Sequence, residues 1–115
     1  MCGLALADLA AAQSAEAEVA KALRIEWKPS TQRRGVEGFV YNGSQYRIGL
    51  MRLKLDVRDG TSPPTQTHAW VYGNIAAQGR SPFSARLTQP GEVVEVTIES
   101  FRLISRDVVP DSQSP

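Results

Sequence analysis

The chain has 115 residues, of which 42% are hydrophobic and 22% charged, and its formal net charge is +1. This length suits one domain with a single core between two layers, and the composition is that of a folded chain. The near-neutral charge argues against a strong general attraction for nucleic acid or for an anionic membrane. Cys2 is the only cysteine, so neither an internal disulfide nor a thiolate zinc cluster can form. No apolar run reaches the roughly 18 residues of a membrane span.

The first 22 residues form an alanine-rich segment for which two interpretations stay open. Met1 to Ala12 resembles the end of a secretory signal, because Ala10 and Ala12 have the spacing of a cleavage site, although no Lys or Arg precedes them. Alternatively, residues 5–23 form a helix, since alanine is the strongest helix former. The segment 1–22 is therefore expected to be either signal-derived or helical.

Residues 23–106 alternate hydrophobic and polar side chains with a period of two, which is typical of strands with one face against a core. Turn signals rich in Gly, Pro and Asn separate the runs. Strands are predicted over residues 23–28, 36–41, 51–58, 67–73, 83–87 and 94–103. The pattern predicts an all-β sandwich over 23–106, followed by a polar tail over 107–115 that is expected to be disordered.

Two of these strands allow more detailed predictions. The best run is Met51, Leu53, Leu55 and Val57, which should face the core while Arg52, Lys54, Asp56 and Arg58 face solvent. In the last strand Val94, Val96 and Ile98 are expected to point inward. The phase then changes to Phe101 and Leu103, which predicts a bulge near Glu99 and Ser100. Trp27 is in phase with Leu23 and Ile25 and is assigned to the core.

Three segments resemble the FxLYD-type domain. They are Gly38-Phe39-Val40-Tyr41-Asn42-Gly43-Ser44, then Leu53 to Gly60, then Gln78-Gly79-Arg80-Ser81-Pro82-Phe83. Leu55, Val57 and Asp59 fill the first, third and last places of the Phe-x-Leu-Tyr-Asp motif, while Arg58 stands where tyrosine is usual. The resemblance covers roughly residues 36–87 and implies an immunoglobulin-like antiparallel β-sandwich of six to seven strands. It also implies a bacterial envelope or secreted protein, and it implies no catalytic residues.

The candidate functional residues are few. His68 is the only histidine, so any catalytic triad must include it. It alternates with Trp70 and Tyr72, opposite a face of Thr67, Ala69 and Val71, and the sequence does not decide which face is buried. Scattered carboxylates and turn glycines predict no metal, cofactor or catalytic site. The residues proposed to contact a ligand or partner are His68, Trp70, Tyr72 and Tyr46.

A basic row, Arg52, Lys54 and Arg58, raises a second possibility. Together with Arg33, Arg34 and Arg47 and with Phe39, Tyr41 or Tyr46, it would bind a polyanion. Asp56 interrupts the row, and long cationic side chains also keep an outer sheet face soluble, so no nucleic-acid partner is predicted.

The expected function is therefore a non-catalytic binding or interaction module of the bacterial cell envelope, periplasmic or secreted, with an unknown ligand and no transmembrane segment. The first alternative is a structural accessory, cytoplasmic or in the envelope, that works by sheet pairing with a protein partner or by self-association. The second is a small enzyme that uses His68.

Overall fold

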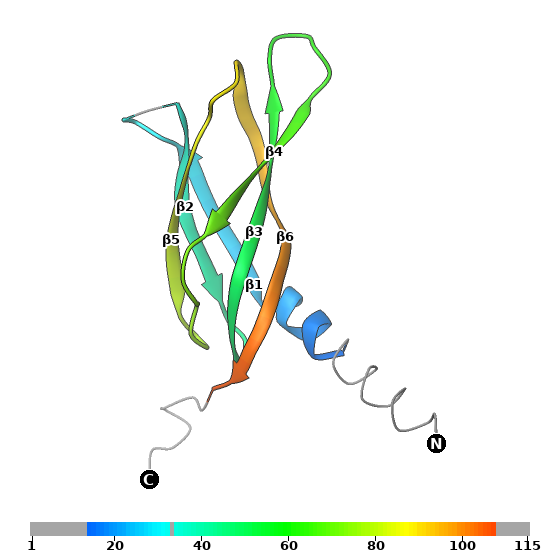
Figure 1. The fold of residues 1–115 in the computed structure, drawn as a ribbon, viewed down its shortest axis with the longest axis vertical. Coiled ribbons are helices and arrows are strands. Elements are labelled where there is room, and N and C mark those ends of the chain that lie inside the picture. Colours follow the sequence, from blue (N-terminus) through cyan, green and yellow to red (C-terminus); the bar gives the residue numbers. More distant parts are fainter. Residues whose placement is uncertain (1–13, 33, 108–115) are drawn as a thin grey trace.

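The computed structural model describes residues 14–32 and 34–107. They form a two-layer β-sandwich whose strands all pair antiparallel (Figure 1). One sheet has the order β1-β2-β5 and the other the order β4-β3-β6. The strands are β1 (Leu23–Pro29), β2 (Gly35–Asn42), β3 (Tyr46–Arg58), β4 (Thr65–Val71), β5 (Arg80–Arg86) and β6 (Glu92–Arg106). The predicted all-β sandwich is confirmed.

The core lies between the sheets and is built from the alternation seen in the sequence. Met51, Leu53, Leu55 and Val57 are each at most 2% exposed, so the inward face of β3 is the predicted one. Val36 and Val40 of β2 and Phe83 and Ala85 of β5 face them from the other sheet. Each fully buried aliphatic side chain of this kind stabilises the fold by about 1.5–3 kcal/mol relative to exposure.

A helical segment, residues 14–21, precedes β1. Its Val19 is fully buried in the core cluster, because it covers the sandwich at the end where β1 begins and β6 finishes (Figure 1). The helical alternative therefore holds for residues 14–21, and the proposed signal sequence, residues 1–12, lies outside the described residues. In the described part of the chain, no helix is long and apolar enough to cross a membrane.

Strand β6 is irregular along its length. Glu99 has no partner on β3, since Arg52 pairs with Ser100 and Leu53 with Ile98, and the predicted bulge is thereby confirmed. Two more register shifts leave Val94 and Ile104 unpaired in the same way. The inward orientation predicted for Val94 is wrong, because the bulge turns it outward to 44% exposure and Val93 packs against the core instead.

Strand β3 begins five residues earlier than the sequence pattern indicated, at Tyr46 rather than Met51. The sequence pattern does not show the early part of the strand, because Gly49 and Leu50 interrupt the alternation between Ile48 and Met51. Leu50 adopts a left-handed conformation with φ of 48° and is exposed. Such a conformation is uncommon for a residue with a side chain and marks a fourth irregularity opposite β6, between Gly49 and Arg52.

Candidate functional site

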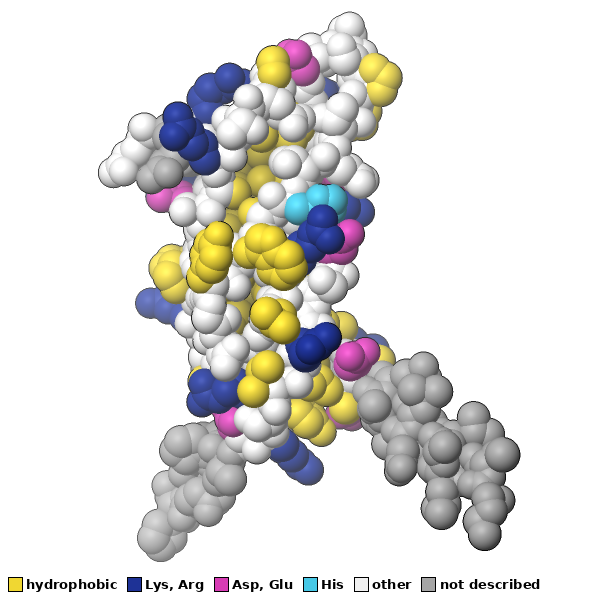
Figure 2. All heavy atoms as spheres, viewed as in Figure 1, with side chains coloured by type: hydrophobic (Ala, Val, Ile, Leu, Met, Phe, Trp, Pro, Cys, Tyr) yellow, Lys and Arg dark blue, Asp and Glu magenta, His cyan; other side chains and the backbone are white. Residues whose placement is uncertain are grey.

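The orientation of β4, which the sequence left open, is settled by its register. Thr67, Ala69 and Val71 pair with the inward residues of β3, so His68 and Trp70 lie on the outer face of the sheet. Trp70 is 49% exposed, and Tyr72, just after the strand, is 87% exposed. These are large aromatic surfaces to leave in water. Figure 2 shows the histidine on this side of the molecule, beside basic and acidic side chains and next to a band of hydrophobic ones.

Four outer-face residues from three strands form a connected group, here called the Glu99 cluster: His68, Trp70, Arg52 and Glu99. Glu99 Oε2 lies 2.8 Å from His68 Nε2 and 3.5 Å from Arg52 Nε. The Arg52 guanidinium carbon lies 5.9 Å from the centroid of the Trp70 ring, within cation–π range. Because Glu99 is the bulged residue of β6, its carboxylate reaches across β3 to a residue of β4.

Trp70 and Tyr72 also form one wall of a groove of about 930 Å³, which crosses the β1-β2-β5 sheet. We call this the aromatic groove. Its residues come in three consecutive register rows across that sheet: Glu26, Phe39 and Pro82; Trp27, Gly38 and Phe83; and Lys28, Glu37 and Ser84, with Ser81 beside them. A volume of this order is typical of ligand pockets. Trp27 packs against the core, as predicted, and lines the groove as well.

Gly38 explains why β1 and β2 lie so close together at the centre of the groove. A Cβ atom at this position would collide with the backbone carbonyl of Glu26. Glycine removes that conflict and leaves the β2 position of the middle row without a side chain, between Trp27 and Phe83. The groove is therefore shaped by a missing side chain as well as by the aromatic ones around it.

Two arginine side chains beside the groove lie over aromatic rings. The guanidinium carbon of Arg80 lies 4.6 Å from the centroid of Phe39, and that of Arg24 lies 4.5 Å from the centroid of Tyr41. The Tyr41 hydroxyl donates to Glu26 Oε1 at 2.8 Å. Phe39 and Tyr41 thus lie on the β1-β2-β5 sheet, whereas Arg52 and Lys54 lie on the other one. Phe39 and Tyr41 are therefore not interleaved with Arg52 and Lys54.

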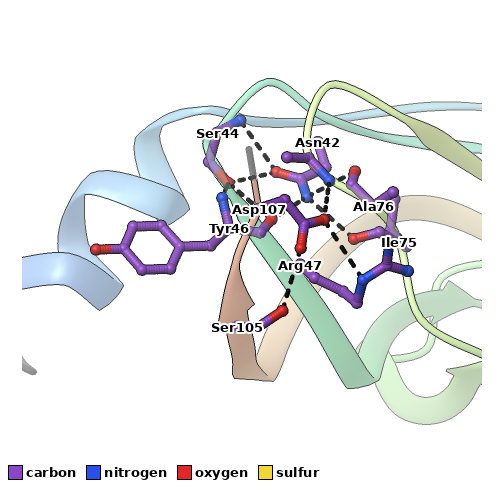
Figure 3. Close-up of polar contacts among 9 residues, drawn as sticks. Asn42, Ser44, Tyr46, Arg47, Ile75, Ala76, Ser105 and Asp107 are labelled. Atoms are coloured by element: carbon purple, nitrogen blue, oxygen red, sulfur yellow. Dashed lines mark hydrogen bonds and ion pairs between the residues drawn. The ribbon is translucent and has the colours of Figure 1, made fainter. Parts of the chain in front are cut away.

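Tyr46, the fourth predicted contact residue, lies at the start of β3, whereas Trp70 pairs with Arg52 in the middle of that strand. It is half-buried and packs against the core, and its ring points away from the neighbouring polar groups (Figure 3). Its backbone carbonyl accepts a hydrogen bond from Asn42 Nδ2 at 2.7 Å. Tyr46 therefore does not join His68, Trp70 and Tyr72.

The polar groups around Tyr46 belong to a buried network, here called the Asn42 cluster (Figure 3). Asn42 is 1% exposed, and its Nδ2 also donates to the carbonyls of Ile75 and Ala76 at 3.2 and 3.1 Å. Its Oδ1 accepts from the amide and the hydroxyl of Ser44. The network joins the end of β2 to the β4–β5 connection, which makes it a structural feature.

Asp107 closes the same end of the molecule, at the first position of the predicted tail. Its carboxylate accepts a hydrogen bond from the backbone amide of Ala77 at 3.2 Å and lies 3.4 Å from Arg47 Nε. The Ala77 amide, with smaller contributions from Ser105 and Arg47, lowers the pKa of Asp107 below its ordinary value of 3.8. The other tail residues, 108–115, lie outside the described part of the chain.

The aromatic groove was only partly foreseeable. Of His68, Trp70 and Tyr72, which the sequence indicates as contact residues, Trp70 and Tyr72 line the groove and His68 does not. The sequence contained no signal that β1, β2 and β5 would complete it, because that depends on which strands pair. Within the described residues no group of three or more His, Cys, Asp or Glu side chains is placed to hold a metal ion.

Comparison with protein-family models, with curated proteins and with solved structures found no match for this chain.

Proposed function

We propose that this chain is a non-catalytic binding module of the bacterial cell envelope, periplasmic or secreted, and that the aromatic groove is its binding surface. The observation that carries the proposal is the position of Trp70 and Tyr72, 49% and 87% exposed, on the rim of a groove with further aromatic residues inside it. Exposed aromatic side chains cost hydration free energy in the free protein, and they bind well because little side-chain entropy is lost on contact.

The order of the strands supports an immunoglobulin-like topology. In that fold the first, second and fifth strands form one sheet, and the third pairs with the sixth in the other. Here β1-β2-β5 and β4-β3-β6 follow that order, with β4 as the additional edge strand beside β3. This agreement, and the resemblance to the FxLYD-type domain, favour an envelope location over a cytoplasmic one.

The alternative of a structural accessory that pairs its sheet edges is disfavoured at two of the four edge strands, β6 and β5. Strand β6 has unpaired residues at Val94, Glu99 and Ile104, and bulges of this kind interrupt the regular ladder that a further strand would need. Strand β5 contains Pro82, which has no backbone N–H to donate. Strand addition is therefore the weaker explanation.

The enzyme alternative is weaker still. His68 lies outside the aromatic groove, and its Nε2 is paired with Glu99 Oε2. In the part of the chain that the structure describes, no hydroxyl forms a hydrogen bond with His68. A nucleophile activated by this histidine would need that contact.

Site-specific photo-cross-linking tests the proposal. A benzophenone amino acid is placed at Tyr72 and, as a matched control, at Val94, which is exposed and does not line the groove. In cells that make the chain, we expect adducts from position 72 and not from position 94. Equal adduct levels at both positions, or none at position 72, would contradict the proposal.

A further inference from the structure

The nature of the groove indicates how its ligand is held, given the proposed function. The edge strand beside it, β5, has Pro82 in its middle, so a peptide strand cannot pair regularly there. Apart from Gly38, the lining residues offer side chains that include rings, hydroxyls, carboxylates and one ammonium group. Recognition on the β5 side of the groove therefore uses stacking and side-chain hydrogen bonds rather than a main-chain ladder.

The charge of the groove excludes one class of ligand. Glu26 and Glu37 face a single lysine, Lys28, so the lining carries a net charge of −1, from two carboxylates and one ammonium. Arg24 and Arg80 lie against the rings of Tyr41 and Phe39, and Arg52 lies against the ring of Trp70. A phosphate or other polyanion would need a cluster of free cations, and none is present among the described lining residues.

The remaining groups suit a ligand with apolar faces and many hydroxyls. The flat rings of Trp70 and Tyr72 offer stacking surfaces, and Trp27 and Phe39 extend the aromatic lining. A hydroxyl group donates to the carboxylates of Glu26 and Glu37, accepts from Lys28, and does both with Ser81 and Ser84. Sugar rings combine these two properties, with C–H groups on their faces and hydroxyls at their edges.

We propose, on the basis of the proposed binding function, that the aromatic groove binds an uncharged oligosaccharide chain. Its sugar rings stack on Trp70 and Tyr72, and its hydroxyls bind the carboxylates of Glu26 and Glu37. The Glu99 cluster contributes by orienting the Trp70 ring, because Arg52 lies between Glu99 and that ring. Arg52 and Glu99 are positioning residues in this arrangement.

The two tryptophans of the chain, Trp27 and Trp70, both line the groove, so their fluorescence reports directly on its occupancy. The full chain is titrated with cellohexaose, xylohexaose, mannohexaose and chitohexaose. We expect a saturable change in emission with at least one of them. Trp70→Ala and Tyr72→Ala should each weaken that binding about tenfold or more, since a lost stacked ring costs about 1.4 kcal/mol.

Three variants make this test specific. Trp70→Phe keeps a ring and should retain part of the affinity that Trp70→Ala loses. Glu37→Gln should weaken binding, because a neutral amide is a poorer acceptor for hydroxyl donors than a carboxylate. Val94→Ser removes an equally exposed apolar residue outside the groove and should leave binding unchanged. Circular dichroism of each variant shows that its fold is intact.

The outcomes separate this inference from the proposed function. If no hexasaccharide binds but a polyproline peptide or heparin binds in a Trp70-dependent manner, the oligosaccharide assignment is wrong and the binding function stands. Binding of a hexasaccharide that is insensitive to Trp70→Ala and Tyr72→Ala would also overturn the assignment. If none of these probes binds and the Tyr72 cross-link gives no adduct, both proposals fail.

Discussion

The Asn42 cluster and the Glu99 cluster use similar polar groups in opposite environments. In the first, Asn42 and Ser44 are 1% and 8% exposed, and the described side-chain atoms of both have hydrogen-bond partners. In the second, Glu99, Arg52 and His68 are partly open to water. A buried polar group must be paired because an unpaired one costs about 1–3 kcal/mol, whereas an exposed ion pair contributes about 0–1 kcal/mol. The first cluster holds the fold together, and the second leaves its face available for binding.

The largest effect should come from Asn42→Ala. This change removes the Nδ2 donor that the carbonyls of Tyr46, Ile75 and Ala76 share, and it removes the Oδ1 acceptor of the Ser44 amide and hydroxyl. We expect the free energy of unfolding to fall by about 3 kcal/mol, measured by urea denaturation followed by tryptophan fluorescence. Gln45→Ala, an exposed neighbour, serves as the control. A loss below about 1 kcal/mol would show that the buried cluster is not what joins these segments.

Ser44→Ala tests the same cluster with a smaller change. It removes the hydroxyl that donates to Asn42 Oδ1 at 2.6 Å and accepts from the Tyr46 amide at 3.1 Å. We expect a loss of about 1 kcal/mol in the same assay. Because the two residues share one network, the double variant should lose less than the sum of the single losses. Additive losses would mean that Asn42 and Ser44 act independently.

How far the sequence predicts the fold depends on what each register shift does to the hydrophobic pattern. Between Ile98 and Phe101 the two intervening residues are polar, so the bulge at Glu99 shifts the visible phase and was predictable. At Val93-Val94 and Leu103-Ile104 both neighbours are apolar. Either member of such a pair fits the inward position, and the pattern cannot reveal the shift. The orientation of Val94 was mispredicted for this reason.

The candidate site was predictable only where it is local in sequence. His68 and Trp70 alternate along β4 and Tyr72 follows the strand directly, so their grouping could be read from the spacing. The rest of the groove comes from β1, β2 and β5, and the carboxylate of the Glu99 cluster comes from β6. These neighbours are set by long-range pairing between strands, which no local pattern encodes. Tyr46 was included because it lies between the strands predicted over 36–41 and 51–58, and its place in β3 and its packing against the core were equally out of reach.

Asp107 adds a pH-dependent contribution at the buried end. Its pKa is lowered in the folded state, chiefly by the Ala77 amide. The ionised carboxylate therefore stabilises the fold at pH values above the ordinary pKa of 3.8. That contribution is lost as the pH falls through the lower, folded-state pKa. Asp107→Asn should therefore lower the urea midpoint slightly at about pH 6 and have no effect at about pH 2. Ser105→Ala keeps the carboxylate and should keep the acid dependence. A difference between wild type and Asp107→Asn that is the same at both pH values would contradict this assignment.

Glu99→Gln is expected to have the smallest effect on stability. It is also the sharpest test of the difference between the Asn42 cluster and the Glu99 cluster. Glutamine keeps the size of the side chain and removes its charge, so Arg52 and His68 lose their shared anionic partner. The free energy of unfolding should change by less than about 0.5 kcal/mol, because exposed ion pairs are screened by water. Glu95→Gln, on the same strand, is the matched control.

Binding should respond to Glu99→Gln even though stability does not. Without Glu99 the Arg52 guanidinium is no longer held behind the Trp70 ring, and the emission of Trp70 and its affinity for a stacked ligand should both change. If instead the variant loses more than about 1.5 kcal/mol of stability, the Glu99 cluster fastens β6 to β4 as the Asn42 cluster fastens its own segments. The outer face would then be part of the scaffold, and the orientation of Trp70 would follow from folding rather than from a binding role.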